Sequence, residues 1–219
     1  MIATEVFNRL GPAKRQHVID AALVEFAENG YERASTNKIV SGAKIGKGML
    51  FYYFGSKKNL YRFLTDHCLE QVEHFLSDVK KQDAGNLIER YRAISQIKWR
   101  YYHSNPNMFN FLATAMRPDG LKQLTPKQRA ANTRMRYERD EALYRNIDET
   151  LFRPRINAKQ AAEYIRWIME GYERKLTLEF EQKNWRGDPK MLENAWRDFE
   201  EFLIRLEKFF YKEKEVKCK

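Results

Sequence analysis

Apolar residues recur every three to four positions along most of the chain, the spacing that places them on one face of an α-helix. The sequence contains no useful length of strand-like alternation. Six prolines fall between the periodic segments and separate them. The pattern predicts an all-α protein with a loop at about 117–125 and helices over about residues 12–29, 36–43, 47–54, 56–81, 86–103, 106–116, 126–153, 158–183 and 190–213.

The short helices predicted over 36–43 and 47–54 follow a helix-turn-helix pattern. Residues with the spacing that packs two short helices together at a steep angle are Ile39, Val40, Ala43, Ile45, Leu50 and Phe54. The same pattern leaves a second set pointing outward: Lys47, Gly48, Met49, Tyr52 and Tyr53. Exposed tyrosine and methionine suit contacts with phosphates and thymine methyl groups of DNA. The alternative is a plain helical hairpin inside a bundle.

Charge favours the DNA-binding interpretation. The formal net charge is +10, and the window from Arg33 to Thr65 holds seven basic residues and no acidic one. Within it, Thr36 and Lys57 each lie at the start of a predicted helix, where free N–H groups and the positive dipole end bind phosphate. A basic, acid-free helix-turn-helix predicts a surface that docks on phosphates and contacts bases.

The stretch from Thr36 to Leu60 resembles the DNA-binding domain of TetR/AcrR-type transcriptional regulators. It contains the pattern T-x-x-I-V-x-x-A-x-I-x-x-G-x-L-F-Y-Y-F-x-S-K-x-x-L, and the helix ending at Gly30-Tyr31 is similar to the first helix of that family. The resemblance covers about residues 9–65. It implies that DNA contacts fall on Thr36, Asn37, Lys47, Gly48, Met49, Phe51, Tyr52, Tyr53 and Lys57.

Two positions depart from the family pattern. The turn glycine common in the family is Lys44, and a positive φ costs energy in a residue with a side chain, so a slightly different turn is expected. The usual tyrosine near the end of the recognition helix is Phe51, which lacks the hydroxyl for one phosphate contact.

The middle segment is rich in large side chains, which fit either an ordinary helical core or the wall of a ligand cavity. The resemblance implies a small-molecule pocket in the C-terminal domain. Candidate pocket residues are Trp99, Tyr102, His103, Phe109 and Tyr137. Residues 106–157 carry 10 basic and 6 acidic side chains, a surplus of four positive charges. If part of this charge faces the cavity, the effector is apolar or aromatic with a neutral or anionic group, and cations are disfavoured.

The last two predicted helices carry apolar stripes, and the one over 190–213 is too wide for a helix with one buried side. Such helices need two partners, which predicts a four-helix interface in a two-fold homodimer. Gly171 would let a neighbouring helix approach closely. The predicted interface residues are Ile168, Tyr172, Phe199, Phe202 and Leu206. The alternative is that both stripes pack within one chain.

Several classes of protein are disfavoured. Cys68 and Cys218 have no paired spacing, which argues against a disulfide framework or a zinc site and fits a reducing cytoplasm. No signal peptide or membrane span is indicated, so we expect a soluble, cytoplasmic protein without cofactor or metal. His67 and His74 share a helix face but lack a third ligand. No nucleophile–base pair or carboxylate dyad supports catalysis.

The sequence thus predicts a two-domain regulator, with a helix-turn-helix DNA-binding domain over residues 1–55 and a helical regulatory and dimerisation domain over 56–219. The resemblance implies a repressor that leaves a palindromic operator in double-stranded DNA when a small ligand binds. Two alternatives stay open: a ligand-independent DNA-binding or architectural protein, and a helical-bundle enzyme. The effector, the operator and the regulated genes are not encoded in any pattern of this sequence.

Overall fold

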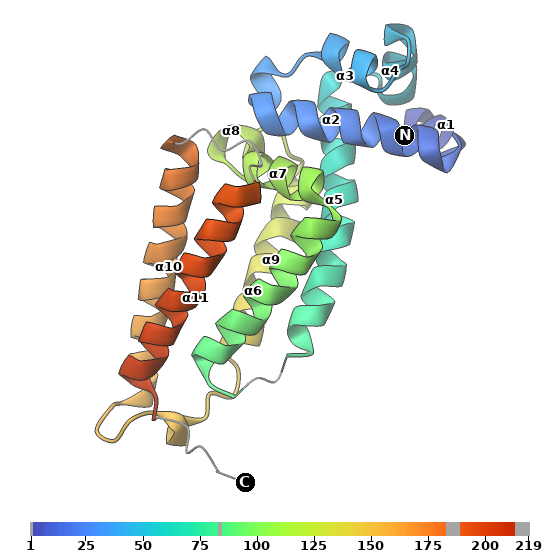
Figure 1. The fold of residues 1–219 in the computed structure, drawn as a ribbon. Coiled ribbons are helices and arrows are strands. Elements are labelled where there is room, and N and C mark those ends of the chain that lie inside the picture. The colour runs from blue at the N-terminus through green and yellow to red at the C-terminus, as the bar shows by residue number, and fades with distance from the viewer. Residues whose placement is uncertain (1, 83–84, 183–188, 213–219) are drawn as a thin grey trace. The chain divides into compact units, whose positions relative to one another are not determined.

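The computed structural model describes residues 2–82, 85–182 and 189–212, and it confirms the all-α prediction (Figure 1). The described ranges hold no strand, only an isolated bridge between Phe152 and Tyr211. The helices are α1 (Ile2–Asn8), α2 (Pro12–Arg33), α3 (Thr36–Gly42), α4 (Lys47–Phe54), α5 (Lys57–Lys80), α6 (Leu87–Ser104), α7 (Pro106–Ala115), α8 (Pro118–Leu121), α9 (Pro126–Tyr144), the 3-10 helix η1 (Glu149–Leu151), α10 (Ala158–Gln182) and α11 (Pro189–Phe210).

The chain packs as two compact units. The first comprises residues 1–76 and 100–137, and the second comprises residues 77–99 and 138–219. Helices α5, α6 and α9 contribute residues to both units. This division by packing follows a different line from the predicted domain boundary after residue 55, which stays a prediction.

An aromatic core holds the first unit together. Phe26 on α2, Tyr61 on α5 and Phe111 on α7 are fully buried, and their rings contact one another at centroid distances of 5.0–6.3 Å. Such distances suit tilted and edge-to-face aromatic pairs, which add to the stabilisation from burial alone. Cys68 lies in the same core, and burial raises the pKa of its thiol to about 12. Cys218 falls outside the described residues.

Helix α2 is broken near its end by Gly30. This glycine has φ 65° and ψ 176°, a left-handed conformation that other residues rarely adopt. The Thr114 hydroxyl of α7 donates a hydrogen bond to the Ala27 carbonyl one turn earlier (3.1 Å). The predicted helix end at Asn29-Gly30 therefore coincides with the break, and α7 satisfies a carbonyl beside it.

The structure differs from the predicted helix pattern in three places. The sequence pattern missed α1, and the predicted loop over 117–125 contains the short helix α8. The helix expected over 126–153 ends at Tyr144, because the Arg90 guanidinium donates hydrogen bonds to the carbonyls of Leu143, Arg145 and Asn146. These bonds occupy the orphan carbonyls of the last turn.

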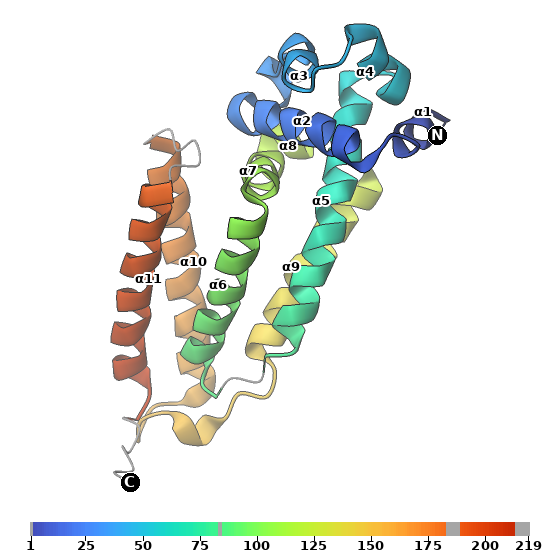
Figure 2. The same cartoon turned by 45° about the vertical axis from the view of Figure 1, so that its right-hand side comes forward.

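In the second unit, α10 and α11 lie side by side (Figure 2). Tyr172 of α10 stacks on Phe202 of α11 with 4.4 Å between ring centroids and contacts Phe199 at 5.3 Å. Trp196 of α11 contacts Trp99 of α6 at 5.3 Å. Aromatic rings thus join α10, α11 and the second half of α6.

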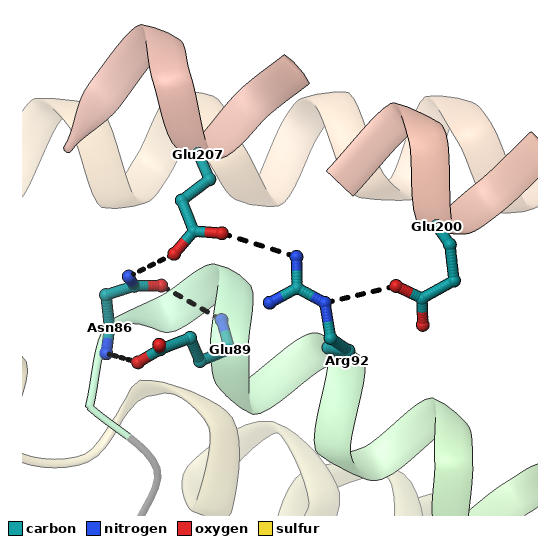
Figure 3. A network of polar contacts seen from close by, with 5 residues as sticks. All are labelled: Asn86, Glu89, Arg92, Glu200 and Glu207. Atoms are coloured by element: carbon teal, nitrogen blue, oxygen red, sulfur yellow. Dashed lines mark hydrogen bonds and ion pairs between the residues drawn. The ribbon is translucent and has the colours of Figure 1, made fainter. Parts of the chain in front are cut away.

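A polar network links the start of α6 to α11 (Figure 3). Arg92 donates to Glu200 (3.1 Å) and to Glu207 (3.3 Å), and the Asn86 amide also donates to Glu207 (2.9 Å). Asn86 and Glu89 exchange two hydrogen bonds that cap the first turn of α6. Because one guanidinium and one amide serve two carboxylates, the network fixes the register of α11 on α6.

Candidate nucleic-acid interface

Helix α3 is tied to α2 at its first turn. Ser35 precedes α3 in extended backbone, and its hydroxyl accepts a hydrogen bond from the Lys38 N–H (3.4 Å). The N–H of Ser35 donates to the carboxylate of the buried Glu25 on α2 (2.8 Å). A hydroxyl cap and a carboxylate therefore fix the start of the helix-turn-helix to the helix beneath it.

The turn between α3 and α4 holds Lys44 in the left-handed conformation, with φ 54°. The next residue, Ile45, donates its N–H to the Val40 carbonyl (3.0 Å), and Gly46 precedes α4 in extended backbone. The lysine thus adopts the conformation that glycine takes at lower cost. Packing of α4 on its neighbours offsets this strain.

Helix α4 separates a buried face from an exposed one, as predicted. Leu50 and Phe54 are buried, while Lys47 and Gly48 are exposed. Three large side chains also remain in solvent: Met49 at 40% exposure, Phe51 at 39% and Tyr52 at 61%. Large exposed side chains this close together on one short helix are unusual for a surface without a partner.

The prediction that Tyr53 points outward is wrong. Its side chain is 1% exposed, and its ring contacts Phe7 of α1 at 5.6 Å and Phe54 at 6.3 Å. The helical repeat of α4 leaves Tyr53 on the outer face, but Phe7 of α1 covers this side chain. With α1 in place, this tyrosine supports the recognition surface from beneath.

Lys57, at the start of α5, is already engaged within the chain. Its ammonium donates to the carbonyl oxygen of Glu32 (3.0 Å) and lies 5.0 Å from the centroid of the Tyr31 ring. Burial raises the pKa of Tyr31, and the negative charge of Glu32 adds to this shift. Lys57 therefore braces the segment after the Gly30 break. Its predicted phosphate contact stays a prediction.

The remaining predicted contacts lie at the start of α3, where Thr36 is half-buried and Asn37 is exposed. One residue that packs against α4 was not predicted from the sequence. Phe7 of α1 is fully buried against α4, and the only signal for it is the spacing of Val6, Phe7 and Leu10, which is too short to predict a helix by itself.

The residues predicted to line an effector pocket are only partly in contact with one another. Tyr102, His103 and Phe109 lie together in the first unit, with Tyr102 5.9 Å from His103 and 6.1 Å from Phe109 between ring centroids. Trp99 belongs to the second unit, where it contacts Trp196. Tyr137 is 69% exposed, so its placement in a pocket wall is wrong.

The predicted dimer residues pack largely within one chain. Leu206 is 8% exposed, and Tyr172, Phe199 and Phe202 join α10 to α11 by ring contacts. Ile168 is half-buried. Contacts within the chain thus cover part of this set, and because four of the five side chains are only half-buried, their place in a dimer interface stays a prediction. The exposed apolar residues of α10 are others: Tyr164, Trp167 and Leu178.

The sequence profile described as "Bacterial regulatory proteins, tetR family" matches residues 18–63, which contain most of α2, all of α3 and α4, and the start of α5. Residues 18–63 therefore match the DNA-binding domain of the TetR family. Helices α3 and α4 are the helix-turn-helix of that domain.

Two transcriptional repressors and one solved structure are similar to the chain over a longer range. The repressor NicS of Pseudomonas putida is 26% identical over 49% of this chain and 50% of its own length. The repressor AcnR of Corynebacterium efficiens is 24% identical over 72% of this chain and 79% of its own. In fold, the chain is similar to a TetR family regulator from Chloroflexus aurantiacus, with a TM-score of 0.64, 23% identity and coverage of 95% and 98% of the two chains.

The next two findings apply only to the described residues. None of the helices there is long and apolar enough to cross a membrane. No group of three or more histidine, cysteine, aspartate or glutamate residues is arranged to hold a metal ion in the same ranges.

Proposed function

We propose that this protein is a cytoplasmic transcriptional repressor that binds a palindromic DNA operator as a homodimer and leaves it when a small molecule binds. The observation that carries the proposal is the exposed face of α4. Met49, Phe51 and Tyr52 stand in solvent on a helix of eight residues, inside a window that carries basic side chains and no acid.

These side chains suit the major groove of DNA. The groove admits an α-helix, and apolar side chains there contact thymine methyl groups. Lys47, in the first turn of α4, brings a positive charge to the helix end that already favours phosphate. Gly48 has open space around its Cβ position, so the backbone of α4 is free to approach the DNA closely. Tyr52 supplies a hydroxyl for a phosphate or a base edge.

A homodimer suits the proposed palindromic operator. Two copies related by a two-fold axis present two α4 helices, which contact half-sites about one helical turn apart. A ligand releases the dimer only if it binds better to a conformation in which the two helices no longer fit both grooves. NicS and AcnR are both named as repressors, which supports repression as the sign of regulation.

The test is fluorescence anisotropy with DNA from the intergenic regions beside the gene, at two salt concentrations. Lys47→Ala and Tyr52→Ala should each weaken operator binding by about 1–3 kcal/mol, the usual size of one base contact. The fold should stay intact because both side chains are exposed. Tyr137→Ala is the matched control, since it removes an exposed tyrosine from α9.

Three outcomes would contradict the proposal. Unchanged affinity in both α4 variants would exclude this face as the docking surface. Equal affinity of the wild type for every DNA sequence would favour the architectural alternative instead. Binding to no DNA at all would leave the helical-bundle enzyme as the remaining alternative.

A further inference from the structure

Helix α1 lies outside the part of the chain that the family profile matches. It comprises Ile2–Asn8 and precedes residues 18–63, the part that the family profile covers. Nevertheless α1 packs directly against the recognition helix α4. An element outside the conserved profile thus contacts the helix proposed to enter the DNA groove.

The contact is made by Phe7, which is 0% exposed. Its ring lies 4.9 Å from Phe54 and 5.6 Å from Tyr53, both on α4. It also meets Phe63 of α5 edge-on at 5.3 Å. Phe7 therefore fills the space between α4 and α5 and touches both, so the position of one helix on the other depends on it.

Helix α4 is too short to hold this position by itself. It has eight residues, and no side chain caps its N-terminus. Isolated helices of this length are marginal in water, so tertiary packing must fix its direction. The ring of Tyr53 lies 6.0 Å from that of exposed Tyr52, which gives Phe7 an indirect connection to the outer face.

Helix α1 is itself anchored. The Arg15 guanidinium of α2 donates to the Asn8 carbonyl at the end of α1 (2.7 Å), where a positive charge also suits the helix dipole. Val6 and Leu10 pack against the core of the first unit. The helix is thus a fixed part of the domain, held at its end and along its inner face.

We propose that α1, through Phe7, positions the recognition helix and thereby sets how strongly the protein prefers its operator over other DNA. The inference rests on the DNA-binding function proposed above. Base-edge contacts need α4 at a defined tilt, whereas phosphate contacts by flexible basic side chains tolerate small displacements. A displaced α4 therefore loses specific affinity and retains most of its non-specific affinity.

The experiment compares full-length wild type with Phe7→Ala, Phe7→Leu and Asn8→Ala. Affinity is measured for operator and for unrelated DNA below the melting temperature of every variant. We expect the operator preference of Phe7→Ala to fall about tenfold, the equivalent of about one base contact. Phe7→Leu, which keeps apolar volume, should recover part of it. Asn8→Ala, on the exposed side of α1, should match the wild type.

Partial unfolding has a different signature. If Phe7→Ala only reduced the fraction of folded protein, affinities for operator and for unrelated DNA would fall by the same factor. An unchanged ratio between them would overturn the inference.

Amide hydrogen exchange of the free protein separates this result from a failure of the proposed function. Phe7→Ala should speed exchange in residues 47–54 and leave residues 87–99 unchanged. If the wild type binds no DNA but exchange in α4 rises in this way, the DNA-binding function fails and the packing role of α1 stands. If exchange in α4 is unchanged, the positioning role is refuted whether or not DNA binds.

Discussion

At the scale of single residues, burial raises the pKa of several tyrosine hydroxyls. Tyr211 is 2% exposed, and its hydroxyl accepts a hydrogen bond from the Leu87 N–H (3.3 Å). Burial raises the pKa of Tyr211 to about 12, and the Leu87 hydrogen bond and the Arg90 charge oppose this shift only in part. Burial also raises the pKa of Tyr61 and of Tyr91 above the usual value. These shifts make stability depend on pH.

We predict that the free energy of unfolding falls as the pH rises from about 10 to about 12. Below pH 10 both states keep the Tyr211 proton, so its contribution is complete. Above that, the unfolded chain loses the proton first and becomes relatively more stable. For Tyr211 the loss amounts to about 2–3 kcal/mol.

Urea unfolding at pH 8, 10 and 11.5 measures this effect. Tyr211→Phe should be less stable than wild type at pH 8, by about 1–3 kcal/mol, because the buried Leu87 N–H loses its acceptor. Between pH 8 and pH 11.5, the free energy of unfolding should fall less for Tyr211→Phe than for the wild type. Parallel pH profiles for the two proteins would contradict the assignment to Tyr211.

At the scale of elements, α10 presents an outer stripe that its own chain leaves uncovered. Tyr164 is 46% exposed, Trp167 54% and Leu178 49%, and they recur at helical spacing on either side of Gly171. A Cβ built on Gly171 meets nothing within 4 Å, so a second helix has room to cross there. We predict that this stripe takes part in the homodimer interface together with the residues predicted from the sequence.

Trp167→Glu should therefore dissociate the dimer, because it places a charge in a desolvated apolar contact at a cost of about 2 kcal/mol or more. Analytical ultracentrifugation at micromolar concentration checks this, with Tyr137→Glu on α9 as the control for an exposed aromatic residue. Phe202→Glu should instead unfold the α10–α11 pair, since Phe202 stacks on Tyr172 within the chain. A dimeric, stable Trp167→Glu variant would exclude this stripe from the interface.

At the scale of the whole molecule, the proposed function requires that effector and DNA compete through conformation. One candidate contact for the effector is Asn110 of α7, which lies near Tyr102 and whose side-chain oxygen is buried without a hydrogen-bond partner. An unpaired buried acceptor is costly, and a ligand with a hydrogen-bond donor would satisfy it. We therefore propose an apolar or aromatic effector, neutral or anionic, with such a donor beside Tyr102 and Phe109.

A thermal-shift panel of lipophilic alcohols, phenols, acids and cations tests this proposal. An effector at a hundredfold excess over Kd should raise Tm by roughly 5–10 °C and lower operator affinity by the coupling factor that links the two sites. Asn110→Leu should keep the fold and lose most of this response. Tight binding of a cation that releases DNA would show that the charge argument from residues 106–157 is wrong.

Most of the fold and most of the exposed face of α4 could be predicted from the sequence. Periodic apolar residues identify helices because a helix must bury one face, and the pattern around Ile39, Leu50 and Phe54 placed Lys47, Met49 and Tyr52 outside as they are found. The acid-free basic window is likewise a property of composition, which needs no coordinates.

The tertiary structure decided those features that depend on contact with another helix, such as the burial of a side chain or the end of a helix. Whether Tyr53 is inside or outside is set by α1, and where α9 ends is set by Arg90 of α6. On α10, Tyr172 and Trp167 are both aromatic, but only contact with α11 reveals that the first is covered and the second exposed. A helical repeat fixes the order of residues around one helix. It carries no information about which side a distant segment will cover.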